Sequence, residues 1–299
     1  MNYLFHLLIY LNIYAIVAMS LNLISGYCGL LTLAHAGYFA VGGYAYALAT
    51  VKLGWSFIPA VLLGIGMSSL LSLAVSIPAW RFRGNFFVMM SLAVQSLLFS
   101  LLHNWSSPGA ELGTWRNLTN GPFGIAGISK PVLFGMKFQA IASIALISLA
   151  IALVCAGICW LLLSSPWGRL LKALRDDELA ARGLGKNTRF IKVQVLAIAC
   201  GMVAVAGALY AAYVGYIDPN AASLDESVLF LCMAIVGGVG NFRGPLVGAI
   251  VLLAIPEILR FVDIPDAMAA NLRLMAYGVL LVVMMHVRPQ GLAGDYRIE

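Results

Sequence analysis

The stretch YLFHLLIYLNIYAIVAMSLNLIS, residues 3–25, decides the fold class of this chain. It contains no Lys, Arg, Asp or Glu, and it is longer than the about 20 apolar residues with which a helix crosses a bilayer. No Lys or Arg precedes it and no small-residue cleavage site follows it. We therefore expect a retained first transmembrane helix and not a cleaved signal peptide.

The rest of the chain has the same apolar character. Residues 1–80 contain a single charged side chain, that of Lys52, and the 299 residues are 62% hydrophobic and only 10% charged. A soluble domain carries about 25% charged residues, because its polar surface has to meet water. The composition therefore predicts a polytopic membrane protein.

Further apolar segments follow the first one along the chain. The full set lies at residues 3–25, 29–50, 57–79, 86–103, 139–163, 190–215, 227–241, 245–262 and 272–287. These long runs do not alternate as barrel strands do, so we expect an all-α bundle of about 8–10 transmembrane helices. The segment 29–50 is rich in Gly, Ala and Tyr, which predicts a broken or re-entrant helix. Without repeats or linkers, residues 1–299 form one predicted transmembrane domain.

The Lys and Arg residues predict the orientation, because they gather in cytoplasmic loops. One side of the predicted bundle holds 12 of the 18 basic residues: Arg81, Arg83, the seven between Arg169 and Lys192, Arg243, Arg288 and Arg297. That side is expected to be cytoplasmic, with a loop at about 164–189, and the long loop at about 104–138 is expected to be periplasmic. The N-terminus fits either side. The net charge of +6 follows from this asymmetry, so no nucleic-acid partner is predicted.

The most charged stretch is SPWGRLLKALRDDELAARGLGKN, residues 165–187. Ser165 and Pro166 are typical of a helix start, and Gly183 and Gly185 of a helix end. Leu170, Leu174 and Ala181 fall near one face, which predicts one amphipathic helix on the cytoplasmic side of the membrane.

Three roles compete for this amphipathic helix. A nucleotide-binding P-loop fails, because Ala180 replaces the first Gly, Asn187 replaces the Ser or Thr, and no strand precedes it. A lipid anchor would avoid the central acids Asp176–Glu178. A docking helix for a cytoplasmic partner suits a face of mixed charge. Docking is favoured, with the apolar face seated in a groove of the partner.

A few polar side chains within the apolar segments are candidates for a translocation pathway: Asn22, Thr32, His35, Tyr38, Tyr44, Ser91 and Gln95. An ionisable residue in a span, here His35, is a functional candidate, and uncharged polar groups suit a zwitterionic solute. Hydrogen bonds between helices are the alternative explanation, and polar residues within spans more often have that role. Small residues such as Ala36, Gly37, Ala40 and Gly43 predict close helix packing, and Gly42 with Gly43 is a second possible break.

No pattern of catalytic or metal-binding residues is present in the sequence. The five cysteines lie in or beside apolar segments and are expected to be small buried side chains. Asp218, Asp225 and Glu226 are expected in a short outer loop, either solvated or facing a binding protein.

Five stretches, in this order, resemble the permeases of branched-chain amino-acid ABC importers of the LivM and LivH type. They are SLNLISGYCGLLTLAHAGYFAVGGYAYAL (20–48), WRFRGNFFVMMSLA (80–93), WGRLLKALRDDELAARGLGKN (167–187), VGGVGNFRGPLVGAIVL (236–252) and RPQGLAG (288–294). The third also resembles the EAA loop of bacterial ABC permeases, although Glu178 lies two residues before Ala180 and not directly before it. The tail and the chain length are more similar to the LivM type.

The resemblance implies a non-enzymatic permease subunit in the bacterial inner membrane that moves branched-chain or other neutral amino acids. The implied partners are a second, homologous permease forming a heterodimer, two cytoplasmic ABC ATPase subunits and a periplasmic substrate-binding protein. This chain would bind no cofactor, since ATP and Mg²⁺ belong to the ATPase subunits. The implied coupling residues are Arg169, Lys172, Arg175, Asp177, Glu178, Ala181, Arg182 and Gly185.

Two alternatives to this function stay open. Urea and amide importers share the same sequence patterns, so their permeases fit the stretches as well. A stand-alone secondary transporter or channel would need ion-coupling acids within its spans, and Glu257, near the end of one segment, is the only candidate.

Overall fold

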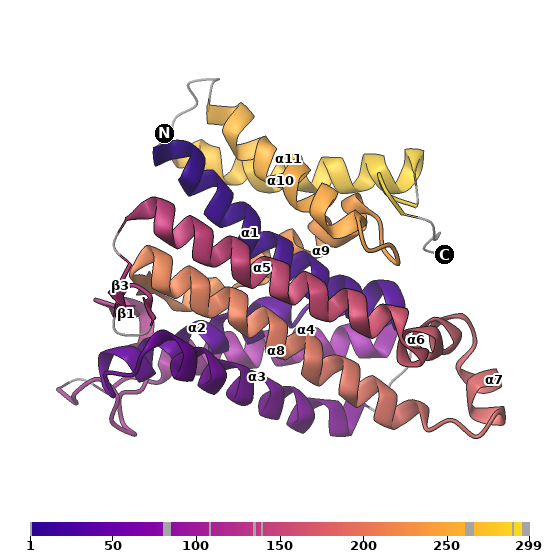
Figure 1. Ribbon diagram of the computed structural model, residues 1–299, viewed down its shortest axis with the longest axis horizontal. Helices are drawn as coiled ribbons and strands as arrows, with labels where there is room; N and C mark the ends of the chain where they lie inside the picture. The colour runs from indigo at the N-terminus through magenta and orange to yellow at the C-terminus, as the bar shows by residue number, and fades with distance from the viewer. Residues whose placement is uncertain are drawn as a thin grey trace.

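The computed structural model describes residues 2–79, 85–107, 109–133, 136–138, 140–260, 266–288 and 290–294. Helices make up most of this part, which confirms the all-α prediction (Figure 1). They are α1 (Asn2–Asn22), the π-helix η1 (Leu23–Tyr27), α2 (His35–Val51), α3 (Phe57–Ala79), α4 (Asn85–Asn104), α5 (Ile141–Ser164), α6 (Pro166–Asp176), α7 (Glu178–Gly183), α8 (Thr188–Val214), α9 (Leu224–Gly237), α10 (Gly244–Arg260) and α11 (Asp266–Val287).

Short elements join the helices. They are the 3₁₀ turns η2 (Gly121–Phe123) and η3 (Pro219–Ala222) and the strands β1 (Ile125–Ala126), β2 (Val132–Leu133), β3 (Met136–Lys137) and β4 (Tyr216–Ile217). β1 pairs antiparallel with β4, and β2 with β3. The β1–β4 pair therefore joins the long loop after α4 to the segment after α8.

Five stretches of the described residues are helical, long and apolar enough to cross a membrane: 2–27, 57–74, 86–104, 141–164 and 188–214. Their positions agree closely with the segments read from the sequence. The predicted break in 29–50 is confirmed, since residues 28–34 are irregular and α2 begins only at His35. Gly42 and Gly43 do not break α2, which runs unbroken to Val51.

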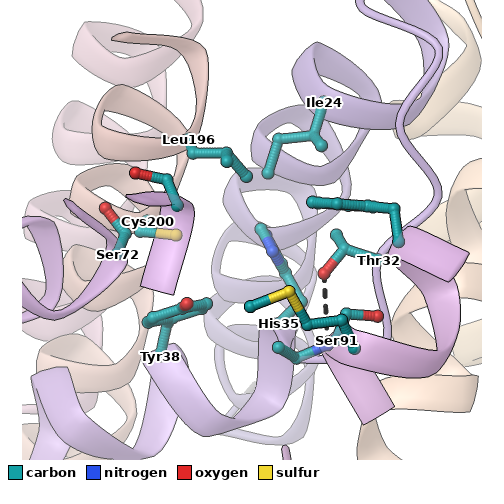
Figure 2. Close-up of a pocket in the computed structure, with 12 residues that line it drawn as sticks. Ile24, Thr32, His35, Tyr38, Ser72, Ser91, Leu196 and Cys200 are labelled. Carbon is teal, nitrogen blue, oxygen red and sulfur yellow. Dashed lines mark hydrogen bonds between the residues drawn. The ribbon is translucent and has the colours of Figure 1, made fainter. Parts of the chain in front are cut away.

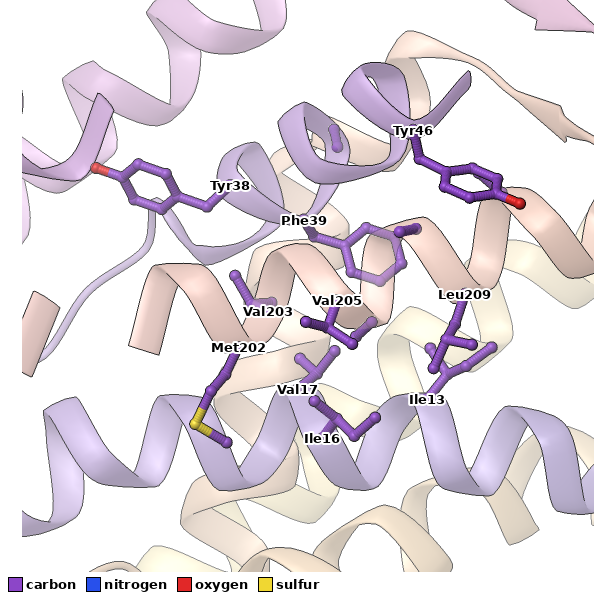
Figure 3. Close-up of a cluster of buried hydrophobic side chains, with 14 of the residues drawn as sticks. Ile13, Ile16, Val17, Tyr38, Phe39, Tyr46, Met202, Val203, Val205 and Leu209 are labelled. Carbon is purple, nitrogen blue, oxygen red and sulfur yellow. The ribbon is translucent and has the colours of Figure 1, made fainter. Parts of the chain in front are cut away.

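The core lies where α8 packs between α1, α2 and α3 (Figure 3). Ile13 and Val17 of α1 meet Val205 and Leu209 of α8 in this cluster, with Phe39 of α2 above them. The α2–α8 crossing is tight because glycines face backbone. A Cβ at Gly207 would overlap the carbonyl oxygen of Phe39, and one at Gly42 would overlap Ala204. The predicted close packing of small residues is therefore present.

The two ends of the bundle differ, as Figure 1 shows. The start of α1 and β1 lie at one end, and α6, α7 and the C-terminal end of α11 lie at the other. The loops predicted to be cytoplasmic thus share one end, although Arg81, Arg83 and Arg297 lie outside the described residues. The N-terminus, which fitted either side of the membrane, lies opposite α6 and α7.

The C-terminal segment closes the turn between α9 and α10. The N–H of Leu292 donates to the carbonyl of Val236 over 2.9 Å, and that of Ala293 donates to Gly237 over 3.0 Å. Gly238, in this turn, has φ of 109°, a conformation that favours glycine, and its Cα lies against Gly294. The stretches 236–252 and 288–294, far apart in the sequence, are therefore two halves of one contact.

Replacing Gly207 with Ala tests the α2–α8 crossing. The added methyl group has to displace backbone of α2, and overpacking of this kind costs about 1–3 kcal/mol. The thermal unfolding midpoint of Gly207→Ala in detergent should fall below that of the unchanged protein. Gly157→Ala is the matched control, because nothing lies within 4 Å of its added Cβ. Equal midpoints for the two variants would contradict the tight crossing.

Candidate functional site

The charged stretch folds as two helices and not as the single amphipathic helix predicted. α6 begins after Ser165, whose side chain accepts a hydrogen bond from the N–H of Trp167, and Pro166 is its first residue. Asp177 interrupts the helix with extended backbone angles, and its carboxylate caps the N–H groups of Leu179 and Ala180. Asp177 therefore ends α6 and starts α7, a competing local arrangement that Asp side chains favour.

The apolar face of this segment is buried in the chain itself. Leu171, Leu174 and Ala181 are each at most 3% exposed, and the two leucines pack with Tyr27 and Val195. The prediction that Leu174 and Ala181 seat on a partner is therefore wrong. Two other leucines are free to do so, since Leu179 is 66% exposed and Leu184 is 80% exposed.

Three of the charged side chains of the segment also bind within the chain. The carboxylate of Glu178 accepts hydrogen bonds from Arg182 at 2.7 Å and from Lys192 at 2.9 Å, and also from Thr188. Arg175 turns inward and donates to the carbonyl of Gly26 over 2.8 Å. Arg169, Asp177, Lys172 and Gly185 are exposed instead. The predicted coupling residues thus divide into an exposed set and a set that holds α6 and α7 in place, and Asp177, which is exposed and also caps α7, belongs to both.

Arg175 links α6 to the break in the first span. Its partner Gly26 lies in η1, and Lys172 lies 5.7 Å from the centre of the neighbouring Tyr27 ring. A π-helix at this position is often a functional feature. From η1 the chain runs through residues 28–34 into the start of α2. A movement of α6 therefore acts directly on the irregular segment.

A group of side chains satisfies the interrupted backbone inside the bundle. Gln95 of α4 accepts from the N–H of Gly37 at 2.9 Å and donates to the carbonyls of Ala222 and Ser223 at 2.6 and 3.0 Å. Ser91, one turn earlier, accepts from the N–H of Leu33 at 2.9 Å. α4 thereby joins the start of α2 to the start of α9, and both starts lie within the bundle.

His35 is the first residue of α2 and is only 1% exposed. Its Nε2 lies 2.8 Å from the hydroxyl of Ser20, which itself donates to the carbonyl of Val17. Nε2 therefore carries the proton, and Nδ1 is a buried acceptor without a partner among the described residues. His35 lines a cavity of about 20 Å³, which is room for about one water molecule.

The structure brings four of the seven predicted pathway residues together. Thr32, His35, Tyr38 and Ser91 line the small cavity (Figure 2). Gln95 lies beside it through its bond to Gly37. Asn22 lies elsewhere and binds the backbone of the α9–α10 turn. Tyr44 is buried, with its hydroxyl unpartnered among the described residues.

Asp225 and Glu226 are not in an outer loop, as the sequence analysis expected. They form the first turn of α9, whose cap is Ser223, and they line a cavity of about 280 Å³ between α1, α9, α10 and α11. Tyr14, Arg273 and Tyr277 line the same cavity. The signal that was missed is the capping pattern of Ser223 followed three residues later by Glu226, which is typical of a helix start.

Comparison with known proteins gives a family match along almost the whole chain. The family described as "Branched-chain amino acid transport system / permease component" matches residues 3–285. The chain is 29% identical to the high-affinity branched-chain amino acid transport system permease protein LivM of Escherichia coli, over 94% of this chain and 67% of that protein. It is 25% identical to a LivM relative of Methanocaldococcus jannaschii, over 96% and 92% of the two chains.

Two further proteins are similar. The autoinducer 2 import system permease protein LsrC of Salmonella paratyphi B is 28% identical over 69% of this chain and 61% of its own length. A solved structure described as an inward-facing conformation of a metal-chelate type ABC transporter has a TM-score of 0.50. It covers 93% of this chain and 86% of its own, at 21% identity, and it shows a shared fold.

Replacing Gln95 with Leu should destabilise the bundle. The N–H of Gly37 and the carbonyl of Ala222 lose the bond to this side chain, whereas the carbonyl of Ser223 keeps the N–H of Ser227. Each buried polar group left unpaired costs about 1–3 kcal/mol. The measurement is the thermal unfolding midpoint. Asn104→Leu, on the same helix, is the control, because Asn104 is exposed and, within the described residues, its side chain binds only Ser100. An equal shift in both variants would refute a special role for Gln95.

We expect the stability of α7 to depend on pH, because of the carboxyl group of Glu178. Partial burial alone raises the pKa of its carboxyl, but bonds from Lys192 and Thr188 and the charge of Arg182 lower that pKa below its ordinary 4.5. Because the pKa is lowered in the folded state, the ion pairs of Glu178 stabilise α7. This stabilisation is present above pH 4.5 and is lost as the pH falls through the folded-state pKa. For a partly exposed pair it amounts to about 1 kcal/mol or less.

Hydrogen-exchange protection of the α7 amides, corrected for intrinsic rates, measures this contribution. Protection in Glu178→Gln should be lower than in the unchanged protein at neutral pH, and the two should converge at acidic pH. Asp176→Asn should change little, because that carboxylate is 58% exposed. A difference that persists unchanged into acid would show that the ion pairs do not hold α7.

Proposed function

Because the chain belongs to the family of permease components of branched-chain amino acid transport systems, we propose that it is a membrane subunit of an ATP-driven ABC importer for branched-chain amino acids. In this proposal it pairs with a second, homologous permease in an inner membrane. A substrate-binding protein delivers the amino acid, and two ABC ATPase subunits hold ATP and Mg²⁺. The family match over residues 3–285 carries the proposal.

The extent of the matches supports an amino acid as the substrate. The LivM relatives align with 94–96% of this chain, whereas the autoinducer 2 permease aligns with 69%. Urea remains the competing substrate, because its importers share the sequence stretches. The uptake experiment below therefore includes both solutes.

The exposed part of α6 and α7 supports ATPase docking at this end of the molecule. α7 projects from the end of the bundle beyond α8 (Figure 1). Leu179 and Leu184 are exposed there beside Asp177 and Lys186. A small apolar patch with a charged rim is the usual composition of a protein interface. In this proposal the two leucines enter the ATPase surface, and Asp177 and Lys186 set the register.

The buried part of the same segment supports transmission of the ATPase movement. A displaced α6 pulls on Gly26 through Arg175, and Gly26 precedes the irregular residues that lead to His35 and α2. Glu178, Arg182 and Lys192 keep α7 attached to the start of α8 meanwhile. In this proposal α6 and α7 move together, and the Arg175–Gly26 bond transmits their movement to the bundle.

The test uses the complete transporter in proteoliposomes, with labelled leucine and labelled urea as separate solutes. The unchanged protein should accumulate leucine and not urea, and only with ATP. The double variant Leu179→Ala/Leu184→Ala should lower leucine uptake and substrate-stimulated ATP hydrolysis by about tenfold, the loss expected when interface anchors worth about 1.4 kcal/mol or more are removed.

The matched control is Leu153→Ala/Leu161→Ala, since these leucines of α5 are 63% and 61% exposed but lie away from α7. Both activities should be unchanged in the control. Urea uptake without leucine uptake would overturn the substrate. Normal leucine uptake and normal substrate-stimulated ATP hydrolysis in the Leu179→Ala/Leu184→Ala variant would refute the proposed docking surface.

A further inference from the structure

The cavity between α1, α9, α10 and α11 carries opposite charges that do not neutralise each other. The carboxylates of Asp225 and Glu226 line it from α9, and the guanidinium of Arg273 lines it from α11. Arg273 forms no ion pair with any described residue. Tyr277, one turn after Arg273 on α11, lines the same cavity. The cavity therefore has separate anionic and cationic groups, with a tyrosine next to the cationic one.

One polar group that lines the cavity has no partner in the described part of the chain. Tyr277 is 8% exposed as a residue, but its hydroxyl is not enclosed by protein, and it forms no hydrogen bond with a described residue. A tyrosine hydroxyl that becomes covered usually finds a hydrogen-bond partner. The free hydroxyl lines the cavity, so a polar ligand there gains a hydrogen bond that the chain itself does not supply.

The remaining walls are apolar. Leu229, Met233, Leu252 and Leu253 line the cavity from α9 and α10. Its volume of about 280 Å³ lies at the lower limit of about 300 Å³ for small-molecule sites. A single small solute with an apolar part fits this size.

From these observations we infer that the cavity binds one zwitterionic amino acid with an apolar side chain, an inference that rests on the proposed function. The α-ammonium group binds Asp225 and Glu226, the α-carboxylate binds Arg273 and the hydroxyl of Tyr277, and the side chain packs on Leu229 and Leu252. The positive end of the α9 dipole stabilises the two adjacent carboxylates in the unliganded site.

The charge arrangement distinguishes between the solutes considered above. An amino acid carries a cation and an anion on one carbon and matches two separated charges of opposite sign. Urea is neutral and has no apolar part, so it would leave both charges and the leucine wall without a counterpart. A ligand that covers these charges without pairing them has to bear the cost of their desolvation. The cavity therefore selects for an amino acid.

The test measures leucine uptake and binding-protein-stimulated ATP hydrolysis by the complete transporter. Glu226→Gln and Arg273→Met should each lower uptake by about tenfold, while ATP hydrolysis stays within about twofold. Glu257→Gln is the matched control, because this carboxylate of the neighbouring α10 binds Tyr3 and does not line the cavity. Uptake should be unchanged in the control.

A steric variant covers the case in which a charge variant fails to fold. Leu229→Trp fills the cavity and leaves its charges in place, and it should also lower leucine uptake by about tenfold. Uptake within about twofold of normal in Leu229→Trp, or in both folded charge variants, would overturn the inference while the importer function stands. If the unchanged transporter accumulates no leucine, the proposed function fails instead.

Discussion

Inside a bilayer every backbone N–H and C=O needs a partner within the protein, because lipid offers none. The chain breaks this rule locally at residues 28–34 and again before α9, and α4 repairs both places. Gln95 supplies an acceptor to one interruption and donors to the other, and Ser91 serves the first. The half-length helices α2 and α9 can start within the bundle only because α4 stands beside them. The cavities near His35 and Glu226 exist because these helices start there.

Rigid packing surrounds this irregular centre. Glycines let α2 and α8 approach until backbone meets backbone, and such a crossing tolerates little sliding. The irregular centre is joined to α6 through η1, where the carbonyl of Gly26 accepts a hydrogen bond from Arg175. The bundle thus combines a stiff crossing with one externally attached joint. In the importer that we propose, the ATPase subunits would act on the bundle at this joint.

Hydropathy alone located the helices well, since α3 begins and ends where the apolar run 57–79 does. Hydropathy does not show whether the apolar face of a helix packs on the same chain or on a partner. Leu174 and Ala181 looked like a docking surface because amphipathic spacing is the same whether a helix packs on its own chain or on another. Asp177 broke the predicted helix because its side chain competes for backbone N–H groups, which is a local effect that periodicity does not record.

The sequence also gave little information about the sites. His35, Thr32, Tyr38 and Ser91 were recognised as polar residues in spans, but their meeting in one cavity depends on α2, α4 and η1 coming together in space. For Asp225 and Glu226 the sequence did contain a local signal, which was overlooked. Glu226 had a readable signal in the pattern of Ser223 and Glu226, and its neglect came from assigning charged residues to loops. Arg273 and Tyr277 join it only through the fold.

The hydrogen bonds of residues 292 and 293 to the α9–α10 turn have a consequence for folding during synthesis. The partners of Val236 and Gly237 are translated more than 50 positions after them, so the turn reaches the end of its synthesis without its final hydrogen bonds. When α9 and α10 are inserted, the turn between them therefore still lacks its hydrogen bonds to the C-terminal segment. Affinity tags or reporter domains placed directly after Arg288 would compete with this last folding step, and a spacer beyond Gly294 would spare it.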